Sequence, residues 1–520
     1  MLYKSNGNLW DNLVMEDDEG LFHNFYLMLN GCLGHIVSRD LVHWETKPVL
    51  DFHVPDTWCE NGENLTGSIF KWNGLWHYSI GTMGRQGIGY GFWVSKDLDH
   101  WVLRDREYPV INKEHVDISL ADEGELIESG WMDPCFRIDE EGVVHGYFSA
   151  NLPVCTHRDT GCIIAHLTSR DTVHWVRQKP IAFPGNKVNR ASCPSLFSIG
   201  GKWYLTFIGH GSGGMRWHTN NRTDTAGTYY MVSNSPDGPF TYTENPLLLG
   251  AGCDSQESWA GRAAVLKGVP YIYSHFTKPM AMNSLKKIVQ TADGGLKCVY
   301  DPAIEQLIVG EFVNVDHAEH IGKTVNWSDL GEWRCEEGVI TGEAEAVGTA
   351  ALIAREKQDF ILNFKAVLEY GACFGAALRA KEYPGKSSMA FEIPGMKIPD
   401  QRRAVVVRVD AEQSCAEILY LERASKEGYG RSQRSIVLGG EERPYDCCRF
   451  DAACGKTVDV KIVARGCYYD LYLDNDLVFS KSMPENPVGD VELLAERGKV
   501  RFFDVRIADL SPLSSESPDD

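Results

Sequence analysis

An internal repeat across roughly the first 305 residues constrains the fold of this chain more than any other feature. A short apolar segment that begins at a glycine occurs five times, and each copy follows another apolar segment that ends in a turn. The copies are GLFHNFYLM (20–28), GLWHYSIG (74–81), GVVHGYFSA (142–150), GKWYLTFIG (201–209) and GVPYIYSHF (268–276). Runs rich in β-branched and aromatic residues, joined by Gly, Asn or Asp, predict a strand, a tight turn and a second strand in each copy.

A third segment follows four of the copies. It reads HIVSRDLVHW (35–44), FWVSKDLDHW (92–101), AHLTSRDTVHW (165–175) and, more loosely, YMVSNSPDGPF (230–240). Its serines are 57, 74 and 64 residues apart, which suits four-stranded blades with variable loops. The His-Trp pairs have a fixed place in the repeat, so we interpret them as structural. The repeat predicts an all-β fold with a five-bladed β-propeller over residues 1–305.

Residues just before the five inner strands of such a propeller converge on one central funnel. Tryptophans and carboxylates gather at these positions. Indole faces stack on the C–H surfaces of sugars, and paired carboxylates cleave glycosidic bonds. The candidate residues for catalysis or substrate binding are Trp10, Asp11, Asn12, Glu63, Thr66, Trp131, Asp133, Arg190, Ser192, Glu257, Trp259 and Arg262.

Several of these residues stand in segments that resemble glycoside hydrolase family 32, the invertases and levanases. His23, Phe25 and Tyr26 follow Asp11 at the offsets of the first-blade motif of that family. The run GHIVSRDLVHWE (34–45) is similar to the family's Gly-His-Ala-Val-Ser-x-Asp-Leu-Val-His-Trp. Thr66-Gly67-Ser68 resembles its Ser-Gly-Ser, Asp133-Pro134 resembles the end of its Arg-Asp-Pro, and the segments 285–287, 293–296 and 302–305 resemble its exit from the propeller. The resemblance covers about 300 residues and implies a propeller followed by a β-sandwich.

The resemblance also implies roles for two aspartates. Asp11 would be the nucleophile, and Asp133 would stabilise the developing oxocarbenium ion. Three positions depart from the family: Ser192 replaces the acid/base glutamate of Glu-Cys-Pro, Met132 replaces the arginine of Arg-Asp-Pro that contacts fructose hydroxyls, and Trp10 replaces the asparagine beside the nucleophile.

Catalysis therefore needs another acid, unless the substrate has a leaving group good enough to need none. A serine hydroxyl does not protonate a leaving group at neutral pH, whereas a partly buried carboxylic acid does. Glu257 precedes the fifth inner strand and is the first candidate, with Glu63 and Glu60 before the second inner strand as the next two.

The pattern changes after Glu305. Long strand-like segments follow, such as FILNFKAVLEY (360–370), KTVDVKIVARG (456–466) and KVRFFDVRIADL (499–510), several of them with alternating apolar and polar residues. Asp474-Asn475-Asp476 indicates a hairpin turn between two further strands. We predict a β-sandwich domain over 306–511 and a disordered tail over 512–520.

Charge and composition exclude several classes of partner. A net charge of −21 argues against nucleic acid or an anionic membrane as partner. The chain lacks a run of about 20 apolar residues, and its first ten residues lack the apolar core of a secretory signal. Fifteen scattered cysteines without a C-x-x-C pair predict thiols in a cytoplasmic protein with no metal and no cofactor.

The function predicted from the sequence is that of a glycoside hydrolase that cleaves a small carbohydrate by a retaining mechanism, with its oligomeric state left open. Two alternatives remain: a sugar-binding or sensing protein without catalysis, and a glycosyl transferase or phosphorylase on the same propeller.

Overall fold

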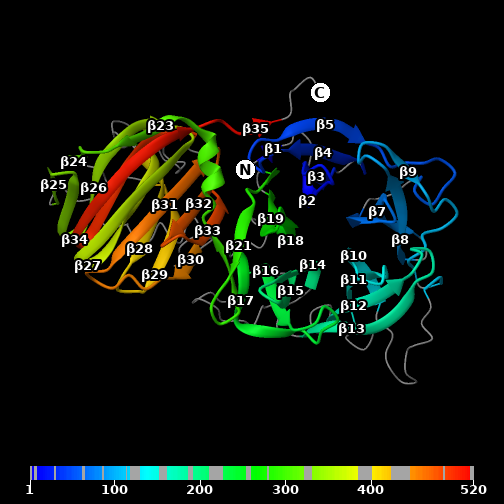
Figure 1. Cartoon of the computed structure of the whole chain (residues 1–520). Helices are drawn as coiled ribbons and strands as arrows, with labels where there is room; N and C mark the ends of the chain where they lie inside the picture. The colour runs from blue at the N-terminus through cyan, green and yellow to red at the C-terminus, as the bar shows by residue number, and fades with distance from the viewer. Residues whose placement is uncertain are drawn as a thin grey trace, which may run out of the picture. The chain divides into compact units, whose positions relative to one another are not determined.

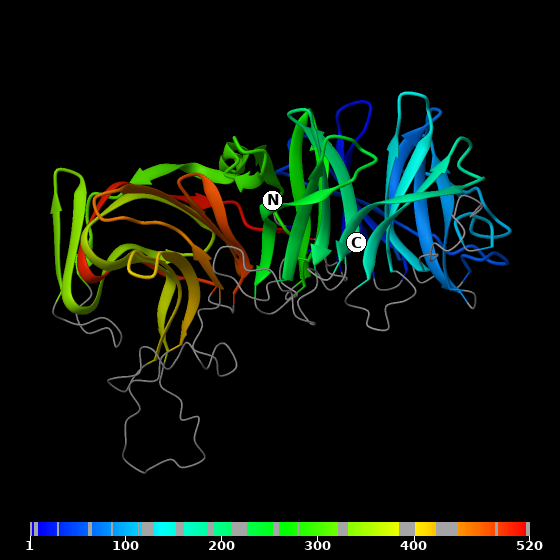
Figure 2. The same ribbon diagram turned by 90° about the horizontal axis from the view of Figure 1, so that it is seen from below.

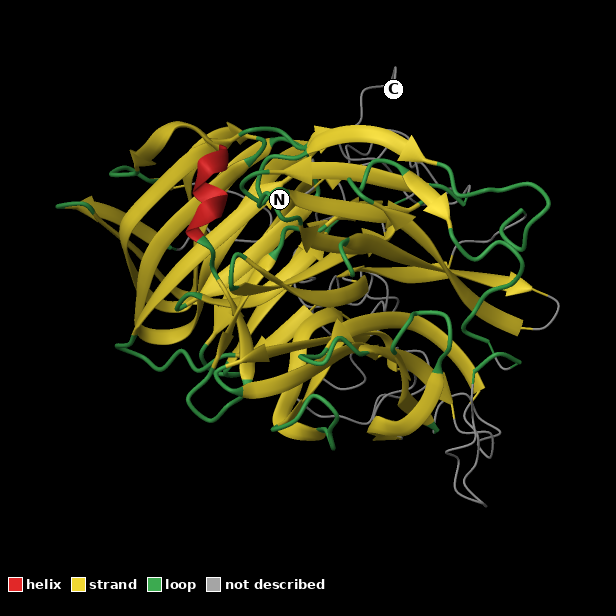
Figure 3. Ribbon diagram, turned by 45° about the vertical axis from the view of Figure 1, so that its right-hand side comes forward, coloured by secondary structure: helices red, strands yellow, loops and turns green. Residues whose placement is uncertain are grey.

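The computed structural model describes residues 3–4, 9–28, 31–60, 65–84, 87–112, 114–116, 129–151, 161–185, 191–209, 226–252, 259–277, 280–320, 331–383, 401–422, 446–483 and 487–515. Strands dominate these residues, with the 3-10 helix Pro302–Leu307 as a short exception (Figure 3). This confirms the predicted all-β class. The described chain divides into two compact units, one ending at Ala303 and including Ser514 and Ser515, the other running from Ile304 to Leu513.

The first unit contains four separate four-stranded antiparallel sheets, one for each of the first four copies of the repeat. They are β2 (Trp10–Glu16) to β5 (Glu45–Leu50) with β3 (Phe22–Leu27) and β4 (Leu33–Ser38) between them; β6 (Leu65–Trp72), β7 (Leu75–Gly84), β8 (Gly87–Ser95) and β9 (Trp101–Leu103); β10 (Ser129–Ile138), β11 (Val144–Asn151), β12 (Cys162–Ser169) and β13 (Val176–Gly185); and β14 (Ala191–Ile199), β15 (Lys202–Gly209), β16 (Ala226–Ser233) and β17 (Thr241–Gly252).

The fifth copy of the repeat differs from the prediction of five separate blades. Its strands β18 (Trp259–Leu266), β19 (Val269–Thr277), β21 (Lys286–Gln290) and β22 (Leu296–Val299) pair antiparallel in blade order. They also pair with β20 (Met280–Met282), which joins β1 (Tyr3–Lys4), and β1 pairs with β35 (Ser514–Ser515). The fifth blade is therefore part of a larger sheet, because the two ends of the chain add strands to it.

The five inner strands surround the centre of this unit. β2 contacts β6, β6 contacts β10, β10 contacts β14, β14 contacts β18, and β18 contacts β2 again. Figure 1 shows the blades arranged around this centre, and Figure 2 shows their strands from the side. The closed ring brings the start of each inner strand to one place, as the repeat predicted.

The turn after the third strand has the same structure in three blades. Ser38 Oγ accepts hydrogen bonds from the N–H groups of Asp40 and Leu41, and Asp40 accepts one from the His43 ring at 2.8 Å. The same bonds recur at Ser95, Asp97 and His100 and at Ser169, Asp171 and His174. Trp44 and Trp175, which follow two of these histidines, are buried in the core. The His-Trp pairs are structural, as predicted.

The second unit is a β-sandwich. Its strands are β23 (Ile308–Asn314), β24 (Glu319–His320), β25 (Glu332–Glu336), β26 (Val339–Lys357), β27 (Phe360–Tyr383), β28 (Gln401–Asp410), β29 (Cys415–Glu422), β30 (Asp446–Arg449), β31 (Thr457–Arg465), β32 (Tyr468–Leu473), β33 (Asp476–Ser482) and β34 (Gly489–Leu510). The two long strands β27 and β34 pair with each other, and β27 pairs with β31 in its first part and with β28 in its second.

Alternating side chains of β27, such as Leu362, Phe364 and Ala366, enter one hydrophobic core with residues of β31 and β34. The predicted hairpin turn lies between β32 and β33, where Asp474 and Asn475 have φ values of 50° and 73°. Two consecutive positive φ values are typical of the two-residue turn that matches strand twist.

The C-terminal tail contains a short strand. The tail was predicted to be disordered from residue 512, but Ser514 and Ser515 form β35 and pair with β1, since their backbone groups find partners there. Residues 516–520 lie outside the described residues.

No helix in the described ranges is long and apolar enough to cross a membrane.

Candidate active site

A β-bulge interrupts each inner strand near its start. The register with the second strand of the blade shifts between Trp10 and Asn12, Leu65 and Ser68, Met132 and Cys135, Ser192 and Ser195, and Trp259 and Arg262. Four bulge residues have positive φ: Asp11 (35°), Asp133 (52°), Cys193 (50°) and Ala260 (50°). A positive φ costs a non-glycine residue on the order of 1–3 kcal/mol, and bulges next to active sites re-aim side chains. Five equivalent bulges around one centre therefore mark the candidate site.

Asp11 is the most deeply buried carboxylate at these bulges. Its side chain is 7% exposed, and its Oδ2 accepts a hydrogen bond from the Thr66 hydroxyl of the neighbouring blade. Its Oδ1 has no hydrogen-bond partner among the described residues. Burial and the nearby Asp133 carboxylate raise the pKa of Asp11 to about 6, against the opposing effects of Thr66 and Arg262.

Asp133 occupies the equivalent bulge in the third blade. Its Oδ2 accepts a hydrogen bond from the backbone N–H of Cys193 at 3.3 Å, and its own N–H donates to the Tyr90 hydroxyl at 2.9 Å. These bonds come from the fourth and second blades, so both neighbours of the third blade position this residue. Asp133 is half-buried, which leaves it more accessible than Asp11.

Arg262 places a positive charge beside the two aspartates. It is 2% exposed, and its Nη1 donates to the Gly67 carbonyl at 2.8 Å. Its Nη2 lies 3.4 Å from the carbonyl oxygens of both Asp133 and Pro134. Burial lowers the pKa of this guanidinium, but the groups around it, Asp133 and Asp11 among them, more than offset this effect and raise the pKa above its ordinary value. It remains charged at the centre of the ring.

Two of the predicted tryptophans flank this centre. Trp10 and Trp259 are half-buried, and the Trp10 ring lies 5.0 Å from the ring of His275 between centroids. His275 is opposite Trp259 in the β18–β19 register. Trp131, predicted to bind substrate, is instead 6% exposed and packs in a hydrophobic cluster with Tyr90 and Phe148. The bulge that follows it turns the strand, so its indole enters the core between blades.

The remaining predicted residues fall into two groups. Asn12 is fully buried, and its side-chain amide donates a hydrogen bond to the Ser274 carbonyl at 3.1 Å. This bond connects the first and fifth blades. Ser192 and Thr66 are buried at their bulges. Glu63, Arg190 and Glu257 lie outside the described residues. Glu60 is described and exposed.

Sequence reasoning missed four residues at this centre: Tyr78, Tyr90, Cys193 and His275. Burial and nearby carboxylates raise the pKa of Tyr78, Tyr90 and Cys193, so each remains neutral. His275 is fully buried, its two ring nitrogens have no hydrogen-bond partner among the described residues, and burial lowers its pKa to about 3. All four are aromatic or sulfur-containing residues in the first three strands of a blade, and ordinary core residues show the same pattern.

A cavity of about 160 Å³ adjoins the bulges and is lined by all five inner strands. Its lining includes Leu13, Ser68, Cys135, Ser195 and Arg262, each of which follows a bulge in its own strand. The five copies of the repeat thus meet at one point.

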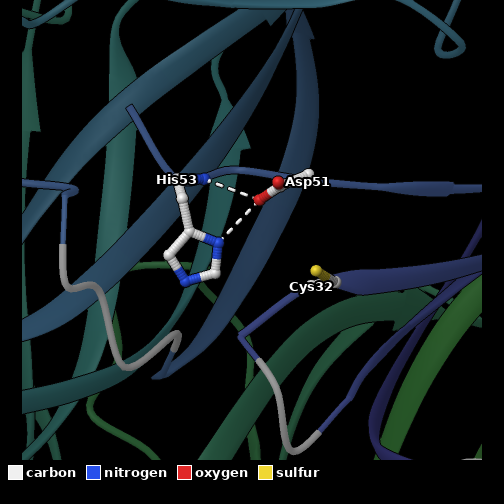
Figure 4. A group of neighbouring side chains, drawn as sticks. All are labelled: Cys32, Asp51 and His53. Carbon is white, nitrogen blue, oxygen red and sulfur yellow. Dashed lines mark hydrogen bonds and ion pairs between the residues drawn. The ribbon is translucent and has the colours of Figure 1, made fainter. Parts of the chain in front are cut away.

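Two groups of side chains in the described ranges bring three metal-capable atoms within 4.8 Å of one another: Cys32, Asp51 and His53, and His145, His166 and Asp237. In the first, Asp51 accepts hydrogen bonds from the His53 ring at 2.6 Å and from its backbone N–H at 3.0 Å (Figure 4). In the second, His145 Nδ1 and His166 Nε2 lie 2.9 Å apart, and His23 and His35 repeat this pairing in the first blade. Two members of each group already hydrogen-bond to each other, and we assign a metal to neither group.

Solved structures share this fold. A β-fructofuranosidase of glycoside hydrolase family 32 from Bombyx mori is 12% identical, with a TM-score of 0.60 and coverage of 99% of this chain and 93% of that one. For a sucrose-6-phosphate hydrolase from Lactobacillus gasseri the values are 14%, 0.62, 97% and 91%, and for an exo-inulinase from Aspergillus awamori 16%, 0.61, 98% and 97%. No protein-family model and no curated protein matches the sequence. At these identities the similarity confirms the predicted resemblance in fold.

Proposed function

We propose that this protein is a glycoside hydrolase whose nucleophile is Asp11. The observation that carries the proposal is the pairing of Asp11 and Asp133 at equivalent strained bulges, facing one buried cation. Natural proteins maintain such backbone strain at functional sites. The fold it shares with enzymes that hydrolyse fructosides supports the reaction class.

The environments of the two aspartates suit different roles. Asp11 is ionised above about pH 6, and one of its oxygens has no hydrogen-bond partner among the described residues, as an attacking atom requires. Asp133 is half-buried with one oxygen held by a backbone N–H, which suits a fixed negative charge beside an oxocarbenium-like transition state.

The acid/base is Glu257 in this proposal. It precedes Trp259, the first residue of β18, and β18 adjoins β2 in the ring of inner strands. Ser192 stands where the resemblance places a glutamate, and its hydroxyl cannot serve as a proton donor at neutral pH. A retaining reaction needs carboxyl groups about 5–5.5 Å apart.

The substrate is a small glycoside in which fructose recognition is weakened. Met132 cannot donate the charged hydrogen bond that an arginine at this position gives to sugar hydroxyls, a loss of about 2 kcal/mol. We expect slow turnover of sucrose and inulin. Invertase-like rates on sucrose would show that this inference from Met132 is wrong.

The test is a screen of the purified protein against fructosides, arabinofuranosides, galactosides and aryl glycosides, followed by two variants. Asp11→Asn should abolish turnover of every substrate. Glu257→Gln should slow natural glycosides by on the order of 10²-fold or more but spare aryl glycosides, whose leaving groups need little protonation. Wild-type behaviour of Glu257→Gln on both substrate types would exclude Glu257, and Glu63→Gln would be measured next.

A sugar-binding protein without catalysis is the second candidate, and Ser192 favours it because it replaces an acid. Calorimetric titration with the same sugars separates the two functions. A sugar that binds to wild type and to Asp11→Asn with equal affinity, and is not turned over by wild type at any pH, would establish binding alone.

A further inference from the structure

Arg262 connects parts of the propeller that are far apart in the sequence. It belongs to β18 in the fifth blade, and its hydrogen-bond acceptors belong to β6 and β10 in the second and third blades. All three acceptors, the carbonyls of Gly67, Asp133 and Pro134, lie within bulges. One guanidinium therefore joins bulges of three blades, which its planar fork of donors permits.

The position of the Gly67 carbonyl is fixed by steric limits as well as by its hydrogen bond from Arg262. A Cβ atom at this position would lie 1.9 Å from the backbone oxygen of Ser79. Only glycine fits, so the bulge brings its backbone closer to β7 than any other residue allows. The acceptor that Arg262 uses at 2.8 Å is consequently held from both sides.

The same guanidinium balances the charge at the centre. Asp11 and Asp133 repel each other, and Arg262 opposes the effect of this repulsion on Asp11. Among the described residues, the titratable groups that act on Asp11, Arg262 or their immediate neighbours are Asp133, Tyr78, Tyr90, Cys135, Cys193 and Tyr273. None of these groups is a cation, so Arg262 supplies the positive charge.

We propose that Arg262 is a positioning residue of this site and not a substrate-binding one. It holds the bulges of the second and third blades in register, and its positive charge offsets the negative charges of Asp11 and Asp133. This deepens the proposed function and rests on it. Both terminal nitrogens of the guanidinium donate to backbone carbonyls of the second and third blades, which is the role of a positioning residue.

The test compares Arg262→Met, which removes the charge and the fork, with Arg262→Lys, which keeps only the charge. In Arg262→Met, kcat should fall by on the order of 10²-fold through misplacement of the aspartates. KM should change little, because the side chain does not touch substrate. The acid limb of kcat/KM should move to higher pH by about one unit or more, since an ionised Asp11 loses its cation.

Arg262→Lys should show the fall in kcat with the acid limb close to that of wild type. If Arg262→Met does not fold, this variant still decides the matter. The control is Arg137→Met. Arg137 in the third blade bonds to Tyr147 and Asp237 away from the bulges, and this variant should keep the kcat and acid limb of wild type. An unshifted acid limb in Arg262→Met, wild-type kcat in Arg262→Lys, or a raised KM with unchanged kcat would overturn the proposal.

A stability measurement keeps this proposal distinct from the proposed function. If no glycoside is turned over, the proposed function fails, and the melting temperature is compared at pH 4.5 and pH 7.5. Arg262→Met should lower it more at pH 7.5, where Asp11 is ionised, and this excess should shrink in the double variant with Asp11→Asn. Equal losses at both pH values in both backgrounds would show that Arg262 is not coupled to Asp11.

Discussion

Asp11 has properties that cost the fold stability and that suit the nucleophile proposed here. It is buried, its φ is positive, and Asp133 adds a like charge nearby. Its pKa is raised from an ordinary 3.8 to about 6, so the folded protein holds this proton more tightly than the unfolded chain does. The unfolded chain loses the proton first as pH rises, and the folded state becomes progressively less stable between about pH 4 and pH 6.

Asp11→Asn should therefore stabilise the protein above pH 6 while abolishing activity. The gain should reach at most about 3 kcal/mol at pH 7.5 and fall below about 1 kcal/mol near pH 4, where the carboxyl is protonated in the folded state and about half protonated in the unfolded state. Urea denaturation at the two pH values measures it. Thr66→Val is a useful comparison, because it removes the donor to Asp11 and should raise the pKa of Asp11 further. A variant less stable than wild type at pH 7.5 would contradict this account.

Some site residues could be predicted from the sequence because their carboxylates recur at the same point of the repeat. Asp11 and Asp133 stand at the same point of two copies, and the structure places them at equivalent bulges. Trp131 was predicted to bind substrate but packs in the core, because the bulge after it changes which side of the strand faces the centre. A bulge adds one unpaired residue, and the residues themselves do not show where it falls.

Among the elements, the hairpins of the first and third blades share a chain of buried hydrogen bonds. Asp17 accepts from His23 Nε2 at 3.2 Å, and His23 Nδ1 then accepts from His35. Asp139, His145 and His166 repeat this chain. Burial lowers the pKa of both His35 and His166 to about 3, so each is neutral in the folded protein.

These histidines should make the propeller acid-labile. The unfolded chain gains protons near pH 6.5, whereas the folded protein resists protonation until near pH 3, so stability falls as pH drops from 6.5. At pH 5 each histidine should account for a loss of about 2 kcal/mol. The double variant His35→Gln and His166→Gln should be less stable than wild type at pH 7.5 yet lose less stability on acidification.

Charged side chains lie beside both of these hydrogen-bond networks. They are Lys47 and Asp99 beside the network of the first blade, and Arg137 and Asp237 beside the network of the third blade. The control is His100→Gln, which alters an exposed turn histidine and should keep the acid slope of wild type. Urea midpoints at pH 7.5 and pH 5 give both quantities. A double variant with the full wild-type slope would show that other groups cause the acid lability.

For the whole molecule, the sequence predicted the architecture well because the repeat is a property of many residues at once. Five copies of a strand pair imply a ring, and the contacts of β2, β6, β10, β14 and β18 close it. The boundaries of single sheets were less predictable. The ends of the chain pair as β1 and β35 beside β20, and the short segments involved carry no hydrophobic pattern that would indicate a strand.

At the scale of the whole chain, all fifteen cysteines should be free thiols. The structure has Cys59, Cys135, Cys193, Cys298 and Cys373 as thiols, and burial raises the pKa of Cys59 and Cys298 to about 12. A buried, protonated thiol neither reacts nor exchanges readily, so these side chains act as small apolar residues of the core. Protein unfolded in guanidinium without reductant should titrate fifteen thiols, the number of cysteines in the sequence. The melting temperature should be the same with and without a phosphine reductant. A count of thirteen or fewer, together with a lower melting temperature after reduction, would reveal a disulfide that stabilises the fold.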